Sequence, residues 1–226
     1  MTENRASQQG DRIIQLRVRL CRLSPAIWRR IWVEESCTIA DLHHVLQLLM
    51  NWSDEYLHHF LIRGKRYGIW QPGTIGFYDD ADVVQLGEFA FRQREKFVYR
   101  YNYYDRWELE LRVEAFLPRK AKQFYPTCIA GKRAAPAEDC GGPKRFLELK
   151  DHYSFFHIAS RMNEIINDEN LAENRWDYQD EIRTYLYWLS VDQFARGELN
   201  QRLRQRFRPK APALSNLMAS PEGVGP

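Results

Sequence analysis

The residues best suited to chemistry gather in one glycine- and proline-rich stretch, residues 125–144, which reads YPTCIAGKRAAPAEDCGGPK. It holds two cysteines, a basic pair and an acidic pair. Carboxylates beside basic groups are the equipment of acid–base catalysis and of metal-assisted hydrolysis. If nearby residues join the stretch, the candidate hydrolytic set is His58, Asp105, Lys132, Arg133, Glu138 and Asp139.

The same stretch has a purely structural interpretation. Its three prolines and three glycines predict an irregular backbone throughout. Cys128 and Cys140 are separated by eleven residues, a spacing that fits neither a zinc knuckle nor a redox pair. The segment would then be a packed Ω-type loop against the sheet near Trp107, with both cysteines as free thiols. Both interpretations stay open on the residues alone.

A second candidate site is the tripeptide Trp28-Arg29-Arg30, which places an aromatic ring beside two guanidinium groups. Arginine pairs well with phosphate or carboxylate, so this tripeptide is suited to an anionic ligand. The alternative places Trp28 in the core and pairs Arg29 or Arg30 with Glu108 or Glu110 across the sheet.

The histidines come in adjacent pairs. His58 and His59 fall in a predicted strand, where neighbours point to opposite faces and cannot hold one ion together. His43 is expected to be exposed or to act as a local cap, and not to be a ligand. His44 lies three residues after Asp41, within reach on a helix.

Hydrophobic periodicity predicts the elements that carry these residues. Thr38 and Asp41 form a capping box for an amphipathic helix over 39–49. Alternation of apolar and polar residues predicts strands over 13–21, 27–33, 56–62, 96–103 and 107–116. Helical spacing follows over 146–166 and 178–189, and Ser190 with Gln193 is expected to cap a last helix.

Strands and helices are therefore segregated, which predicts an α+β fold. We expect an antiparallel sheet with an inserted amphipathic helix, covered by helices, and a helical C-terminal part. The expected boundaries are an α+β domain over 12–150 and a helical part packed on it over 151–208. Residues 1–11 and 209–226 are expected to be disordered.

Composition excludes several classes of protein. No apolar run approaches the length of a membrane span, and the N-terminus lacks the apolar core of an export signal. Four cysteines at unrelated spacings suit a reducing cytoplasm. No nucleophile elbow, phosphate loop or zincin motif is present, which favours a non-enzymatic protein.

The net charge of +3 is unevenly distributed. Residues 151–190 hold eight acids against three bases, whereas 196–210 hold six bases against one acid. This basic edge could contact a nucleic-acid backbone without reading sequence. It could equally pair with the acidic stretch 168–181 inside the fold. The edge consists of Arg202, Arg204, Arg206, Arg208 and Lys210.

Several blocks resemble a known family. The segments are PTCIAGKRAAPAEDCGGP, LSPAIWRRIWV, TIADLHHVLQLLMNW, HHFLIRGKRYG and KFVYRYNYYDRWELELRVE. They resemble successive blocks of the plasmid pRiA4b ORF-3-like family, found on bacterial plasmids and as a passenger protein of some insertion sequences. The resemblance covers roughly residues 12–150 and implies a fold and a mobile-element context, but no activity.

The chain departs from the family pattern at two positions that matter for metal binding. Family members commonly have a cysteine where Ala135 stands and a histidine where Leu109 stands. With Cys128 and Cys140 those positions would complete a four-ligand set, so the set is incomplete here. We therefore expect no bound zinc, no cofactor and no assigned catalytic residue. The expected function is a non-enzymatic binding or accessory module; the alternative is a metal-assisted hydrolase or nuclease-like enzyme using the loop residues.

Overall fold

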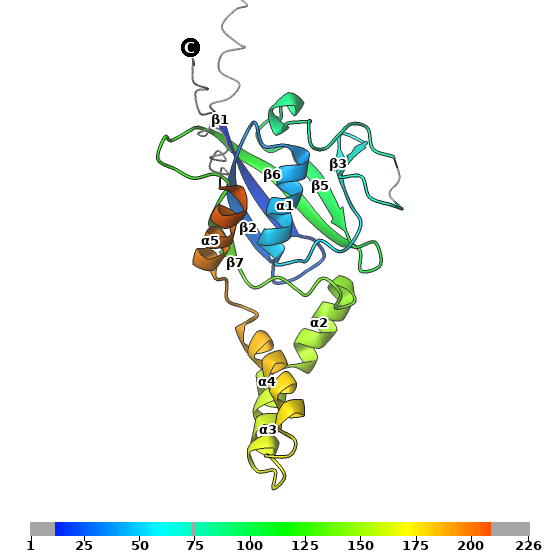
Figure 1. Ribbon diagram of the computed structural model, residues 1–226, viewed down its shortest axis with the longest axis vertical. Helices are drawn as coiled ribbons and strands as arrows, with labels where there is room; N and C mark the ends of the chain where they lie inside the picture. The colour runs from blue at the N-terminus through cyan, green and yellow to red at the C-terminus, as the bar shows by residue number, and fades with distance from the viewer. Residues whose placement is uncertain (1–11, 74–75, 209–226) are drawn as a thin grey trace, which may run out of the picture.

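The computed structural model describes residues 12–73 and 76–208 and has the predicted α+β fold (Figure 1). One seven-stranded antiparallel sheet has the strand order β4-β3-β5-β6-β1-β2-β7. The expected disorder of residues 1–11 and 209–226 lies outside the described residues. The strands are β1 (Arg12–Leu20), β2 (Trp28–Glu34), β3 (His58–Ile62), β4 (Lys65–Tyr67), β5 (Lys96–Tyr101), β6 (Trp107–Pro118) and β7 (Thr127–Lys132).

The core forms between one face of this sheet and α1 (Ile39–Met50), as Figure 1 shows. Thr38 caps α1 as predicted, because its side-chain oxygen accepts the backbone N–H of Asp41 at 3.0 Å. The alternating residues of the central strands supply the opposite side of the core and are almost wholly buried. They include Leu16, Val18, Leu20, Leu109, Leu111 and Val113.

The prediction that the whole stretch 125–144 is irregular is wrong for its first part. Residues Thr127–Lys132 form β7, which pairs antiparallel with β2 at the edge of the sheet. The edge of β2 has unpaired N–H and C=O groups. Pairing with residues 127–132 satisfies these groups, although that segment contains a glycine. The remainder packs on the sheet as expected: the indole N–H of Trp107 donates to the Glu138 carbonyl at 2.9 Å.

Four further helices follow: α2 (Gly142–His152), α3 (Phe155–Ile166), α4 (Arg175–Ser190) and α5 (Arg196–Phe207). The helix expected over 146–166 is thus two helices, divided at Ser154, which caps α3. The expected cap at Ser190 is also wrong, because Ser190 ends α4 and Ala195 precedes α5 without a side-chain cap.

The four helices take two different positions. Helices α2, α3 and α4 form an arm that extends away from the sheet, whereas α5 returns to pack on β7 and α1 (Figure 1). Leu199 and Leu203 anchor α5 in the core. Over the described ranges, the structure contains no helix whose length and apolar character would let it cross a bilayer.

Candidate anion-binding site

The acids of the loop serve to hold it in place. The carboxylate of Glu138 accepts hydrogen bonds from the backbone N–H of Ser53, at 2.8 Å, and from the hydroxyl of Tyr101. One carboxylate oxygen of Asp105 accepts the backbone N–H groups of Gly141 and Gly142 at 2.8 and 3.1 Å. Glu138 thus ties the loop to the chain after α1 and to β5, and Asp105 satisfies the backbone donors at the start of α2, so both acids have a structural role.

In the described structure, the remaining members of the candidate hydrolytic set form no hydrogen bond or ion pair with these two acids. Arg133 pairs with Asp192 at 2.9 Å and donates to the Ala26 carbonyl at 3.2 Å. His58 accepts the backbone N–H of Ile69 at 3.2 Å. Lys132 and Asp139 are exposed. No hydrogen bond or ion pair given by the described residues joins one member of the set to another.

The tripeptide at the start of β2 divides between the two faces of the sheet. Arg30 pairs with Glu114 at 2.5 Å, and not with Glu108 or Glu110 as the alternative expected. Those two acids pair with Arg100 and Lys96 at 3.0 Å each.

Trp28 also lies outside the core. It is half-buried, with the guanidinium of Arg17 stacked 4.9 Å from its ring centroid.

Arg29 points to the opposite face, into the protein. Its side chain is only 2 % exposed, and Nη1 donates to the carbonyls of Trp28 and Lys132 at 2.9 and 3.0 Å. The Nε–H is buried without an acceptor. In the parts of the chain that the structure describes, no carboxylate forms an ion pair with this guanidinium. Burial lowers the pKa of Arg29 from its ordinary value to about 10, so the group stays cationic near neutral pH.

Arg29 lines an open cavity of about 450 Å³, with lining residues from the sheet, α1, α4, α5 and the segments between them. Apolar walls come from Leu48, Leu49, Ala134, Ala135 and Leu199. A second guanidinium, that of Arg202, also lines the cavity and donates to the Asn51 side-chain oxygen at 2.5 Å. A concave site that combines apolar walls with convergent polar groups is the usual form of a small-ligand site. The polar lining is completed by Tyr187, Ser190, Gln193 and Glu198.

Phe194 closes one side of the cavity over Arg29. The guanidinium carbon lies 3.9 Å from the centroid of the Phe194 ring, a cation–π contact. Gly131 of β7 makes this approach possible: a Cβ there would lie 2.4 Å from the Phe194 ring and 2.9 Å from Arg29 Cδ. Sequence reasoning named Arg29, and it named Arg202 only as part of the basic edge. It missed Phe194 and Asn51, because Asn51 ends α1 and only the chain between α4 and α5 brings Phe194 to Arg29.

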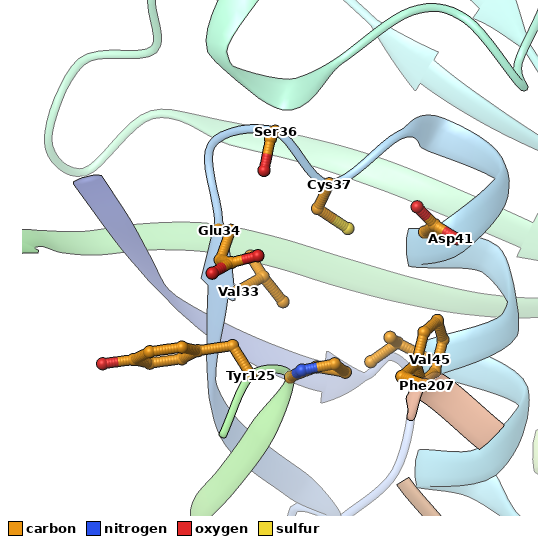
Figure 2. Close-up of a pocket in the computed structure, with 9 residues that line it drawn as sticks. Val33, Glu34, Ser36, Cys37, Asp41, Val45, Tyr125 and Phe207 are labelled. Carbon is orange, nitrogen blue, oxygen red and sulfur yellow. The ribbon is translucent and has the colours of Figure 1, made fainter. Parts of the chain in front are cut away.

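A second, smaller pocket of about 180 Å³ lies between β2, the start of α1 and Tyr125 (Figure 2). Its charged groups are already engaged, because Glu34 pairs with Arg119 at 2.6 Å and Asp41 serves the cap of α1. Burial raises the pKa of the Cys37 thiol well above its ordinary value, so this thiol is not an activated nucleophile. This pocket therefore has no unpaired charge to attract a ligand.

The histidine prediction needs one correction. His43 is neither exposed nor a cap, because its side chain lies on the buried face of α1. It bonds Tyr99 and Asp54, at 2.8 and 2.6 Å. Asp41, which was expected near His44, is occupied by the helix cap, and His44 lies near Asp54 instead.

Comparison with known proteins shows which family this chain resembles. The model of the family described as plasmid pRiA4b ORF-3-like protein matches residues 12–180. The chain belongs to that family. Its match therefore extends beyond the sheet into the helical arm.

Two relatives of this plasmid pRiA4b ORF-3-like chain show what is known of similar proteins. An uncharacterized protein, y4hQ of Sinorhizobium fredii, is 29 % identical over 141 residues, which are 61 % of this chain and 71 % of the relative. A crystal structure of a protein of unknown function, MM3350 from Methanosarcina mazei Go1, superposes with a TM-score of 0.60 at 28 % identity. That comparison covers 84 % of this chain and 98 % of the other. Neither relative carries a described activity.

Proposed function

We propose that this chain is a non-enzymatic binding module that holds an anionic group, a phosphate or a carboxylate, against Arg29. The observation that supports the proposal is a buried cation with no counter-ion. An uncompensated charge inside a protein is costly, and buried charges are as a rule paired. A ligand anion in the adjoining cavity supplies the missing partner and accepts the Nε–H that has no acceptor.

The rest of the cavity suits the same ligand. Arg202 adds a second positive charge at its rim, and Ser190 and Gln193 add neutral donors. The low-dielectric walls strengthen the attraction between Arg29 and an anion. Because Arg29 keeps its proton at neutral pH, the two guanidinium groups outnumber Glu198, the acid in the lining, and the site carries a net positive charge.

A nucleic-acid backbone is the phosphate source that the surface beside this cavity favours. Beyond Arg202, the side chains of Arg204 and Arg206 are exposed and have no acidic partner in the described structure. Lys210 of this edge lies outside the described residues. For the four arginines, the intramolecular pairing considered above is not formed by the described acids of the stretch 168–181. Glu181 bonds Arg161 at 2.8 Å, and Asp180 bonds Arg183 at 3.0 Å. Positive charge therefore continues from the cavity along α5.

The alternative of a metal-assisted hydrolase that uses the loop acids receives less support. Glu138 and Asp105 are committed to backbone N–H groups, and Arg133 is committed to Asp192 and Ala26. A catalytic set needs groups that converge on one reacting atom, and these groups face different parts of the chain.

Calorimetric titration with inorganic phosphate, with acetate and with a short duplex DNA tests the proposal. Arg29→Met removes the charge and keeps the side-chain length, and Arg30→Met is the matched control on the opposite face. We expect one anion per chain for the parent and for Arg30→Met, and none for Arg29→Met. Tight binding of DNA over phosphate identifies the backbone as the source. Equal binding by Arg29→Met and the parent contradicts the proposal.

A further inference from the structure

A cluster of two histidines and one aspartate lies at α1 and the loop after it, and none of the three residues lines the anion cavity. His43 and His44 belong to α1, and Asp54 lies in the loop that follows it. Asp54 Oδ1 is 2.6 Å from His43 Nε2, and Oδ2 is 3.6 Å from His44 Nδ1. One possible ligand atom from each of the three residues lies within 4.8 Å of the other two.

We propose that His43, His44 and Asp54 bind one divalent first-row transition metal ion of the zinc type. Two imidazoles and a carboxylate are a ligand set that such ions take, with a fourth position left for water. Ligand atoms about 2.0–2.1 Å from a tetrahedral ion lie about 3.3 Å apart. The two distances to the Asp54 oxygens, 2.6 and 3.6 Å, lie on either side of that value, and the ligand atoms all lie within 4.8 Å of one another, so side-chain shifts of up to about 1.5 Å bring the three groups onto one ion.

The surroundings of His43 provide the outer support that a ligating imidazole needs. His43 Nδ1 lies 2.8 Å from the Tyr99 hydroxyl, which is 2.7 Å from Gln47 Nε2. In the metal-bound form, Nδ1–H donates to the Tyr99 oxygen and leaves the Nε2 lone pair for the ion. Rotating the Gln47 amide by half a turn then gives the Tyr99 hydroxyl an acceptor in Gln47 Oε1. That oxygen is buried without a partner in the present orientation.

His58 shields the cluster without being a ligand. Its ring stacks on that of His43, with the centroids 3.6 Å apart, and its Nε2 accepts the N–H of Ile69. The neutral ring consequently carries its proton on Nδ1 and has no free lone pair. His44 and Asp54 are about 30 % exposed, which leaves an entry for the ion from solvent.

This proposal departs from two expectations, that His43 is not a ligand and that no metal is bound. The second rested on the incomplete cysteine set around Cys128. The cluster uses no cysteine, and in the described residues it is the place where three such ligands converge. It is also independent of the anion cavity, because no residue is shared between them.

Cobalt substitution tests the site in the full chain. The protein is stripped with a chelator, titrated with Co²⁺ and followed by visible absorption, and zinc is then used to displace the cobalt. We expect one ion per chain, with the d–d bands of a nitrogen and oxygen site and no thiolate charge-transfer band. His44→Ala and Asp54→Asn change half-exposed positions and should each weaken binding at least about tenfold, because each removes a first-sphere contact or its charge.

His157→Ala is the matched control, because His157 lies on α3 outside the cluster, and it should bind cobalt as the parent does. Circular dichroism of each variant confirms that it folds. Three results overturn the proposal: no stoichiometric ion in the parent, a thiolate band that marks cysteine ligation, or parental affinity in both His44→Ala and Asp54→Asn.

Discussion

Replacing Arg29 with methionine should leave the unliganded protein as stable as before or make it more stable, although the residue is fully buried. Lowering the pKa of Arg29 from its ordinary value to about 10 corresponds to a cost of about 3 kcal/mol for keeping the charge buried at neutral pH. The substitution removes that cost. It also removes two hydrogen bonds to the carbonyls of Trp28 and Lys132, each worth about 1 kcal/mol.

The two effects together predict a free energy of unfolding between unchanged and about 2 kcal/mol higher. Ile31→Ala, on the same strand and equally buried, should lose about 2–5 kcal/mol by cavity formation. Urea denaturation followed by tryptophan fluorescence in phosphate-free buffer measures both variants. A loss of more than about 3 kcal/mol in Arg29→Met would show that the charge is compensated within the fold, and would refute the reasoning.

The difference in stability between Arg29→Met and the parent should also depend on pH. A buried cation whose pKa is lowered by folding destabilises the fold below its folded pKa, and this cost disappears as the pH rises. Any advantage of Arg29→Met over the parent should therefore be full at pH 7 and shrink above about pH 10. An advantage that is the same at both pH values would point to packing instead of charge.

Three further predictions concern the surroundings of the site. Gly131→Ala should lower the free energy of unfolding by about 1–3 kcal/mol, because the new Cβ would collide with Phe194 and Arg29. Gly197→Ala on α5 is the control: nothing lies within 4 Å of its Cβ position, so the substitution should be neutral or stabilising. A loss in both variants, measured by denaturation, would contradict this. Burial raises the thiol pKa of Cys128 to about 11, so Cys128 should resist alkylation at pH 8 in the native protein. All four cysteines should react after unfolding. Rapid labelling of Cys128 in the native protein, detected by mass spectrometry, would contradict its burial. If the α5 edge binds duplex DNA, affinity should fall with salt with a log–log slope of roughly −3 to −4, and changing Arg204, Arg206 and Arg208 together to Gln should flatten it. Substitution is preferred to deletion because Leu203 is fully buried, and an unchanged slope would exclude the edge.

The sheet and α1 could be predicted because their signals are local. Alternation in β1 and β6 and the capping box at Thr38 are each contained within a dozen residues. β7 was missed because its formation depends on the free edge of β2, which lies about a hundred residues away in sequence. The burial of His43 did leave a local signal: it falls four residues after Ile39 and three before Leu46, on the buried stripe of α1.

The candidate site was only half predictable. Arg29 stands between Ile27 and Ile31 on the inward face of its strand, so the sequence places a charge among apolar residues. What surrounds that charge depends on tertiary structure. The return of α5 to β7, the approach of Phe194 over Gly131 and the position of Arg202 near Asn51 have no local pattern. Glu138 and Asp105 were predicted as candidate catalytic groups because the sequence does not reveal that their partners include backbone N–H groups.

The central claim is that Arg29 binds an anion in the adjoining cavity. A crystal soaked in tungstate tests this claim most directly. Tungstate has the tetrahedral shape and charge of phosphate, and its anomalous scattering identifies it without ambiguity. The account predicts an anomalous peak in the cavity, within hydrogen-bond distance of the Arg29 guanidinium and absent from Arg29→Met crystals. A cavity without a peak at a concentration that saturates the solution binding, or a peak unchanged in Arg29→Met, would contradict it.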